Sequence, residues 1–193
     1  MSVIRAFIAI DLPVDVQECL DQVSELLQSQ LPGIPVRWVP AENIHLTLKF
    51  LGDVSPSNID VLAEILQAEA LSQSPLEISV GQMGAFPKIR RPRVIWIGVE
   101  APQELISMQR SIDLQTARIG YAPDKRKFSP HLTLGRVSRN ASPKEVSQIG
   151  KVLSEQKIGF LGVARARAVH LFRSDLQPGG AIYTKLFTAS FGE

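Results

Sequence analysis

Residues 44–50 alternate strictly between apolar and polar side chains, in the order Ile44-His45-Leu46-Thr47-Leu48-Lys49-Phe50. An alternation with a period of two is typical of a half-buried β-strand, whose neighbouring side chains point to opposite faces. The pattern therefore predicts that the apolar side chains, Phe50 included, face the core and that His45, Thr47 and Lys49 face the other way. One face of this strand then presents a titratable imidazole beside a hydroxyl donor.

The same tetrapeptide recurs about half a chain length later, as His131-Leu132-Thr133-Leu134, in a chain that has only three histidines. The flanks repeat as well, because Arg37-Trp38-Val39-Pro40 precedes the first copy and Arg126-Lys127-Phe128-Ser129-Pro130 precedes the second. A single copy has an ordinary structural explanation, since threonine is a good strand former and the backbone can satisfy a histidine. Two copies with similar flanks favour an internal duplication that builds one paired site.

The rest of the chain alternates between strand and helix patterns without a seam, as expected for one domain covering residues 1–193. Helices are expected to begin near Pro13, Ser57, Pro102 and Ser142, where Ser142-Pro143-Lys144-Glu145 has the pattern of a capping box. Strands are expected at residues 5–10, 44–50, 76–83, 94–99, 158–163, 168–172 and 182–191 and around the second motif. We therefore predict an α+β fold of two pseudo-symmetric lobes, each an antiparallel sheet with helices on its outer face, with the active-site cleft between them.

The composition is that of a soluble globular protein, with 45% hydrophobic and 21% charged residues. No apolar run approaches the roughly 20 residues that span a bilayer, and the start of the chain lacks the layout of a signal peptide. A single cysteine excludes an internal disulfide. We expect a cytoplasmic monomer that does not associate with membranes.

Positive charge is concentrated in two short segments although the net charge is only +2. One segment contains Lys88, Arg90, Arg91 and Arg93, and the other is Lys125-Arg126-Lys127. Such clusters are common on solvated loops. The second cluster immediately precedes the His131 strand, where it would also attract a polyanion.

Two imidazoles facing one phosphodiester can act as an acid and a base near neutral pH, because the ordinary pKa of histidine is about 6.5. The neutral ring accepts a proton from water and the charged ring protonates the leaving oxygen, while Thr47 and Thr133 donate hydrogen bonds to phosphate oxygens. Two histidines with Asp11 or Asp53 are an alternative zinc site, but the chain has no His-Glu-x-x-His segment or cysteine pair. A Gly-x-Ser-x-Gly elbow and a glycine-rich phosphate loop are absent too. We expect neither metal nor cofactor.

The paired motifs closely resemble those of the two-histidine phosphoesterase superfamily. The opening residues 5–11, the stretch from Arg37 to Gly52 and the tail around residues 171–183 extend the likeness over nearly the whole chain. Within the superfamily the chain is similar to the RNA 2',3'-cyclic phosphodiesterases of bacteria and archaea, also called 2'-5' RNA ligases. The resemblance implies hydrolysis of a terminal 2',3'-cyclic phosphate to a 2'-phosphate, with RNA ends or cyclic nucleotides as substrates.

The resemblance also implies roles for individual residues. His45 would be the proton donor to the leaving 3'-oxygen and His131 the base that activates water, a choice that the residues alone leave open. Thr47 and Thr133 would hold the phosphate, and Arg136 would assist. Strict alternation places Arg136 on the face opposite His131, so it reaches the site only if the strand ends or twists at Gly135.

Three aromatic residues, Phe7, Phe128 and Tyr183, are candidates for stacking on a nucleobase, with core packing as the alternative. The third histidine, His170, lacks a threonine two positions on, so we interpret it as structural. Two other functions stay open at this point. The same site can act on 2'-5' linkages or small cyclic nucleotides, or the protein can be a non-catalytic module that binds RNA ends.

Overall fold

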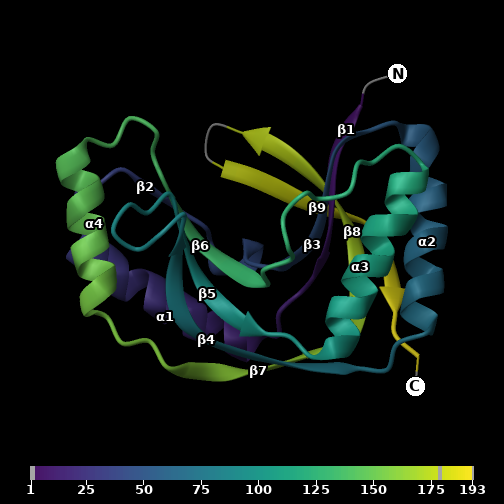
Figure 1. The fold of residues 1–193 in the computed structure, drawn as a ribbon, viewed down its shortest axis with the longest axis horizontal. Helices are drawn as coiled ribbons and strands as arrows, with labels where there is room; N and C mark the ends of the chain where they lie inside the picture. Colours follow the sequence, from purple (N-terminus) through teal and green to yellow (C-terminus); the bar gives the residue numbers. More distant parts are fainter. Residues whose placement is uncertain (1–2, 178–179, 193) are drawn as a thin grey trace.

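Two antiparallel β-sheets form the centre of the computed structural model, which describes residues 3–177 and 180–192 (Figure 1). Sheet A has the strand order β3-β1-β8-β9 and consists of β1 (Ile4–Ile10), β3 (Leu46–Val54), β8 (Ala168–Gln177) and β9 (Gly180–Ser190). Sheet B has the order β2-β6-β5-β4-β7 and consists of β2 (Val36–Trp38), β4 (Leu76–Phe86), β5 (Val94–Glu100), β6 (His131–Val137) and β7 (Phe160–Ala166). The two strands that carry the repeated motif therefore lie in different sheets.

Four helices cover the outer sides of the sheets, and they are α1 (Val14–Gln30), α2 (Ile59–Leu71), α3 (Gln103–Arg118) and α4 (Pro143–Glu155). Helices α2 and α3 pack against each other and against sheet A, while α1 contacts β7 and α4. Figure 1 shows the two helix pairs at opposite ends of the molecule with the sheets between them. This arrangement confirms the predicted α+β fold with helices on the outer faces.

The two halves of the sequence exchange elements between the sheets. Sheet A takes β1 and β3 from the first half and β8 and β9 from the second, while β2 joins β6 in sheet B. The helices cross over in the same way, because α1 lies beside sheet B and α3 beside sheet A. Each lobe therefore contains both halves of the duplicated sequence.

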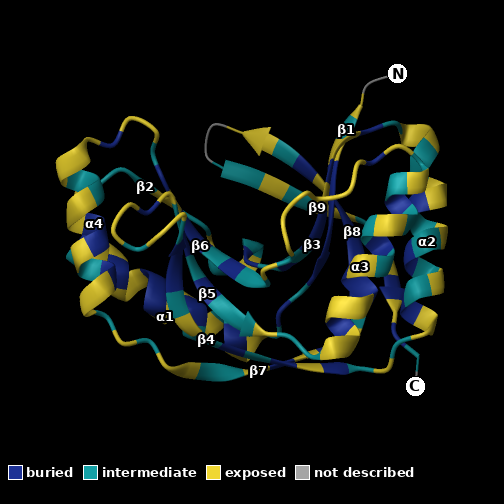
Figure 2. Cartoon of the chain, in the orientation of Figure 1, coloured by how far each residue is buried: buried dark blue, intermediate teal, exposed yellow. Residues whose placement is uncertain are grey.

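Buried apolar side chains hold the helices to the sheets (Figure 2). Leu20 and Leu27 of α1 and Leu62 and Leu66 of α2 are fully buried. Helix α4 begins with the predicted capping box, in which Ser142 accepts a hydrogen bond from the Glu145 amide and its own amide donates to the Glu145 carboxylate. In the described residues, no helix combines the length and the apolar character needed to cross a membrane.

A β-bulge in β3 overturns part of the predicted alternation. Ala9 of β1 lies opposite Thr47 and Ile8 lies opposite Lys49, so Leu48 is the extra residue. Beyond Leu48 the side chains change faces: Lys49 is buried and Phe50 is 66% exposed. The prediction of Lys49 on the face of His45 and of Phe50 in the core was therefore wrong.

The buried Lys49 connects the first motif strand to the segment that leads to the second. Its ammonium group pairs with the Asp113 carboxylate of α3 and donates to the carbonyl oxygen of Ala122 at 2.6 Å. The Asp113 carboxylate also accepts a hydrogen bond from the Asp124 amide at 3.2 Å. The loop that enters β6 is thus held to β3 at its base.

A second bulge lies at the equivalent position of β6. Trp96 of β5 lies opposite Thr133 and Ile95 lies opposite Gly135, so Leu134 is the extra residue. Leu134 and Gly135 are both buried, and Arg136 is exposed. This change of phase at Leu134 and Gly135 places Arg136 on the same face as His131 and Thr133. The family resemblance implied this placement, and strict alternation opposed it.

Candidate active site

Each motif histidine is oriented by a hydrogen bond to the backbone two residues earlier. The Nδ1 atom of His45 lies 2.8 Å from the Asn43 carbonyl oxygen, and that of His131 lies 2.7 Å from the Ser129 carbonyl oxygen. A carbonyl oxygen only accepts hydrogen bonds, so Nδ1 carries the hydrogen in both rings. The Nε2 atom of each ring is thereby left to exchange a proton with a substrate.

Aromatic side chains of sheet A surround His45. Its ring stacks on Phe7, with centroids 4.6 Å apart, and meets the edge of Tyr183 at 5.2 Å. The stack continues from Phe7 to Phe172 at 5.1 Å. This burial lowers the pKa of His45 to about 4, against smaller raising effects of its bond to Asn43 and of the Asp11 charge.

His131 has a similar but more open setting on sheet B. Its ring meets the edge of Phe86 at a centroid distance of 5.0 Å and lies 6.3 Å from Trp96. Burial again lowers the pKa of the imidazole, the bond to the Ser129 carbonyl raises it, and the positive charge of Arg136 lowers it further. The pKa of both motif histidines therefore lies below the ordinary value near 6.5.

Arg136 connects the two histidines electrostatically, because its positive charge lowers the pKa of both His45 and His131. The strands that carry the two histidines also contact each other, since β3 lies against β6 across the two sheets. The arrangement combines two Nε2 atoms with a planar, permanently charged group suited to phosphate.

The motif threonines lie one in each sheet, on the same strand faces as the motif histidines. Thr47 and Thr133 are half-buried, each two residues after its histidine on the same strand face. Within residues 3–177 and 180–192, neither hydroxyl hydrogen-bonds to another side chain or to the backbone. Both hydroxyls are free to donate to a bound oxyanion.

The three predicted stacking residues occupy different environments. Phe7 is only 3% exposed, between His45 and Phe172, so it supports the His45 ring and has no free face for a nucleobase. Phe128 is half-buried and packs against the main core. Tyr183 is half-buried, touches His45 and lines a pocket beside it, so its contact with substrate stays a prediction.

Phe50 is an aromatic residue on the face of His45 that the sequence pattern missed. It lies opposite Phe7 in the β1–β3 ladder, with ring centroids 6.1 Å apart, and it occupies the position of β3 that corresponds to Arg136 in β6. The signal was hidden by the bulge at Leu48, because a period of two assigns Phe50 to the core.

The pocket beside His45 has a volume of about 490 Å³. Its lining is mostly polar and consists of Asp11, Gln17, Glu42, Asn43, His45, Phe172, Tyr183, Thr184 and Lys185. Hydrogen-bonding groups next to aromatic rings suit a nucleoside. Behind it lies His170, which is 7% exposed, bonds to the Thr188 hydroxyl at 3.0 Å and lies 3.6 Å from the Asp11 carboxylate, in agreement with its predicted structural role.

No group of three or more histidine, cysteine, aspartate or glutamate side chains is suitably placed to hold a metal ion within residues 3–177 and 180–192. In particular, Asp11 is paired with Lys185 and lies beside His170. A reaction independent of metal stays a prediction, which the chelator experiment below tests.

Lowering the pH from 7 to 5 should destabilise the folded protein by about 2 kcal/mol through His45 alone. The unfolded chain binds a proton at this residue near pH 6.5, whereas the folded chain does so only near pH 4. The stability is thus fully present above the unfolded pKa and is lost as the pH falls toward the folded one. Urea unfolding of the wild type and of His45→Gln at both pH values measures the difference, and an equal pH dependence in the two proteins would refute it.

Comparison with known proteins gives one consistent family. The family model for LigT like phosphoesterases matches twice, at residues 10–96 and 97–183, in agreement with the internal repeat. The RNA 2',3'-cyclic phosphodiesterase of Methanothermobacter thermautotrophicus is 34% identical over 183 residues, which cover 95% of this chain and 96% of that protein. The enzyme of the same name from Archaeoglobus fulgidus is 36% identical over 183 residues, which cover 94% and 97%.

The fold is similar to that of a crystallised nucleotide complex. The structure of E. coli LigT with 3'-AMP superimposes with a TM-score of 0.78 at 26% identity and covers 99% of both chains. A second structure of that protein, with bound phosphate, has a TM-score of 0.74 at 26% identity and covers both chains completely.

Proposed function

This chain belongs to the LigT-like phosphoesterase family, and on that premise we propose that it is an RNA 2',3'-cyclic phosphodiesterase that uses two histidines as acid and base. The observation that carries the proposal is the pair of equivalent motif strands, β3 and β6, which contact each other across the two sheets and each hold a histidine by a backbone bond to Nδ1. Homologues of that name support the substrate class, and the resemblance to the family supports the roles of the two histidines.

In the proposed reaction, a water molecule attacks the phosphorus of the terminal cyclic phosphate. His131 Nε2 removes a proton from this water as the new phosphorus–oxygen bond forms. The bond between phosphorus and the 3'-oxygen breaks, and His45 Nε2 donates a proton to the departing oxygen. The products are a 2'-phosphate and a free 3'-hydroxyl, and Thr47, Thr133 and Arg136 stabilise the charge that builds up on the non-bridging oxygens.

One feature supports His45 as the acid: the carboxylate of Asp11 raises its pKa, and the effects on His131 include no carboxylate. Burial acts in the opposite direction and is larger, so the pKa of His45 lies near 4. An anionic phosphodiester bound in the same desolvated space favours the imidazolium form, so substrate binding itself prepares the acid.

The test is product analysis on a panel of substrates: an RNA ending in a 2',3'-cyclic phosphate, a 2'-5'-linked dinucleotide and a small cyclic nucleotide. We expect the first to yield a 2'-phosphate end, identified by phosphorus NMR, with unchanged rates in EDTA. The double variant His45→Ala/His131→Ala is the inactive control. A 3'-phosphate product, or activity lost in EDTA and restored by zinc, would contradict the mechanism.

The same panel separates the other functions. Faster turnover of the 2'-5' linkage or of the small cyclic nucleotide would assign the site to that substrate instead. Binding of RNA ends without any turnover would make the protein a binding module. Since both motifs come from one chain, we further propose that a monomer suffices, and that it acts on RNA in the cytoplasm.

A further inference from the structure

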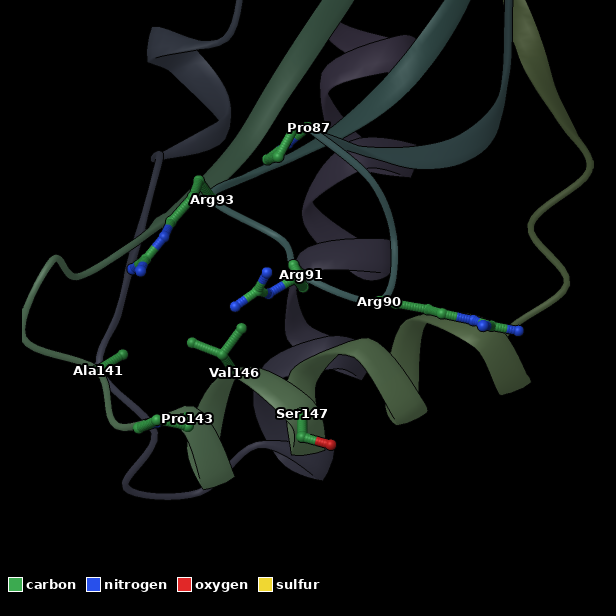
Figure 3. Close-up of a pocket in the computed structure, with 8 residues that line it drawn as sticks. All are labelled: Pro87, Arg90, Arg91, Arg93, Ala141, Pro143, Val146 and Ser147. Carbon is green, nitrogen blue, oxygen red and sulfur yellow. The ribbon is translucent and has the colours of Figure 1, made fainter.

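The loop between β4 and β5, residues 87–93, forms one wall of a pocket that the proposed mechanism does not use. This pocket has a volume of about 430 Å³, and its other wall is the start of α4 (Figure 3). Its lining comprises Pro87, Arg90, Arg91, Arg93, Ala141, Pro143, Val146 and Ser147. In Figure 3, Arg91 extends toward Val146 while Arg93 lies on the side of Ala141.

The charge of this pocket is not neutralised by the protein. Among the described residues 3–177 and 180–192, no carboxylate lies within ion-pair distance of Arg90, Arg91 or Arg93. The nearest acid in sequence on α4, Glu145, is engaged in the capping box with Ser142. The guanidinium groups of Arg91 and Arg93 therefore leave a site of net positive charge, which suits phosphate, while Arg90 points away from them (Figure 3).

The loop is held in place against α4 rather than projecting freely. Gly150 of α4 allows the close approach, because a Cβ atom there would lie 2.7 Å from the Ile89 carbonyl oxygen. At the other end, the Arg93 amide donates to Phe86 at 2.7 Å, and its guanidinium donates to the Ser138 carbonyl at 3.0 Å. That bond leaves four of the five N–H groups of Arg93 for a ligand.

The loop that lines the pocket adjoins the strand of His131, and two further arginines share the face of that histidine. The loop starts directly after Phe86, whose ring packs on His131. Arg37 of β2 lies directly opposite Arg136 of β6, so the two exposed side chains share the face of His131. Like charges directly opposite each other destabilise a sheet, so this arrangement favours an anion between or beside them.

Resting on the proposed function, we infer that Arg91 and Arg93 form a second phosphate site, which binds the backbone of an RNA upstream of its reacting end. The terminal cyclic phosphate occupies the histidine site, and the preceding nucleotides pass Arg136 and Arg37 toward the pocket. The preferred substrate is then an oligonucleotide rather than a mononucleotide. Neither histidine nor threonine takes part in this second contact.

The experiment compares Arg91→Gln/Arg93→Gln with the wild type on two substrates: a short single-stranded RNA with a 2',3'-cyclic phosphate end and a 2',3'-cyclic mononucleotide. We expect KM for the oligonucleotide to rise about tenfold, with kcat/KM for the mononucleotide unchanged within about twofold. The salt dependence of oligonucleotide binding, measured by fluorescence anisotropy, should weaken by about 0.7 in log–log slope for each lost contact. The matched control is Arg110→Gln/Arg118→Gln, which removes the same charge from exposed positions of α3 at the other end of the molecule.

Each outcome decides the question. Unchanged oligonucleotide KM, equal losses on both substrates, or an equal loss in the α3 control would overturn the second site. If neither substrate is hydrolysed by the wild type, the proposed function fails. In that case, anisotropy with a 2'-phosphorylated oligonucleotide still tests the pocket, and identical affinities of wild type and variant would overturn it.

Discussion

Replacing His131 with alanine should lower kcat for the cyclic phosphate by at least about 100-fold, and His45→Ala should do the same. One ring accepts a proton and the other donates one in the transition state. The Nδ1 atoms are bonded to the carbonyl oxygens of Asn43 and Ser129, so Nε2 of each ring is left for proton transfer. Removing the base leaves water without a proton acceptor, and removing the acid forces an alkoxide to depart unprotonated. Single-turnover rates at saturating substrate measure the chemical step directly.

Binding measurements distinguish this chemistry from damage to the site. A 2'-phosphorylated product should bind each variant within about tenfold of the wild type, because Thr47, Thr133 and Arg136 remain. The double variant should be about as slow as the slower single variant, since the two transfers serve one transition state. Losses that multiply in the double variant, or a kcat within tenfold of wild type for either single variant, would contradict concerted acid–base catalysis.

The strands that carry the motifs were predictable because they rest on short-range pattern and repetition. Alternation around His45 and His131 predicted the strands, and the repeat predicted lobes with helices outside. The exchange of elements between the halves was not predictable in this way. It depends on which sheet edge accepts β2 and on which sheet α1 covers, and both are long-range packing choices.

The bulges at Leu48 and Leu134 explain why the sequence pattern assigned some side chains to the wrong face of their strand. A period of two carries no signal for an extra residue, so Lys49 and Phe50 were assigned to the wrong faces. In β6 the resemblance to a family required Arg136 in the site although alternation opposed it, and the bulge at Leu134 resolves that conflict. The bulges occupy equivalent positions, Leu48 and Leu134. After each bulge one further side chain, Phe50 in β3 and Arg136 in β6, lies on the face of the motif histidine.

The assignment of acid and base can be tested by changing the leaving group. In a cyclic substrate with sulfur at the bridging 3'-position, the departing group is a thiolate, whose conjugate acid has a pKa near 8.5, far below that of an alcohol. A thiolate departs without a proton, so a variant that lacks the acid should recover. We expect the wild-type rate to exceed that of His45→Ala by less than about tenfold on this substrate, against at least about 100-fold on the oxygen substrate.

His131→Ala serves as the matched control for this rescue, since loss of the base is insensitive to the leaving group. Its deficit should stay at least about 100-fold on both substrates. Recovery of His131→Ala instead would exchange the two roles, even though Asp11 raises the pKa of His45. Recovery of neither would mean that no histidine protonates the departing 3'-oxygen, and the role of His45 as the acid would be wrong.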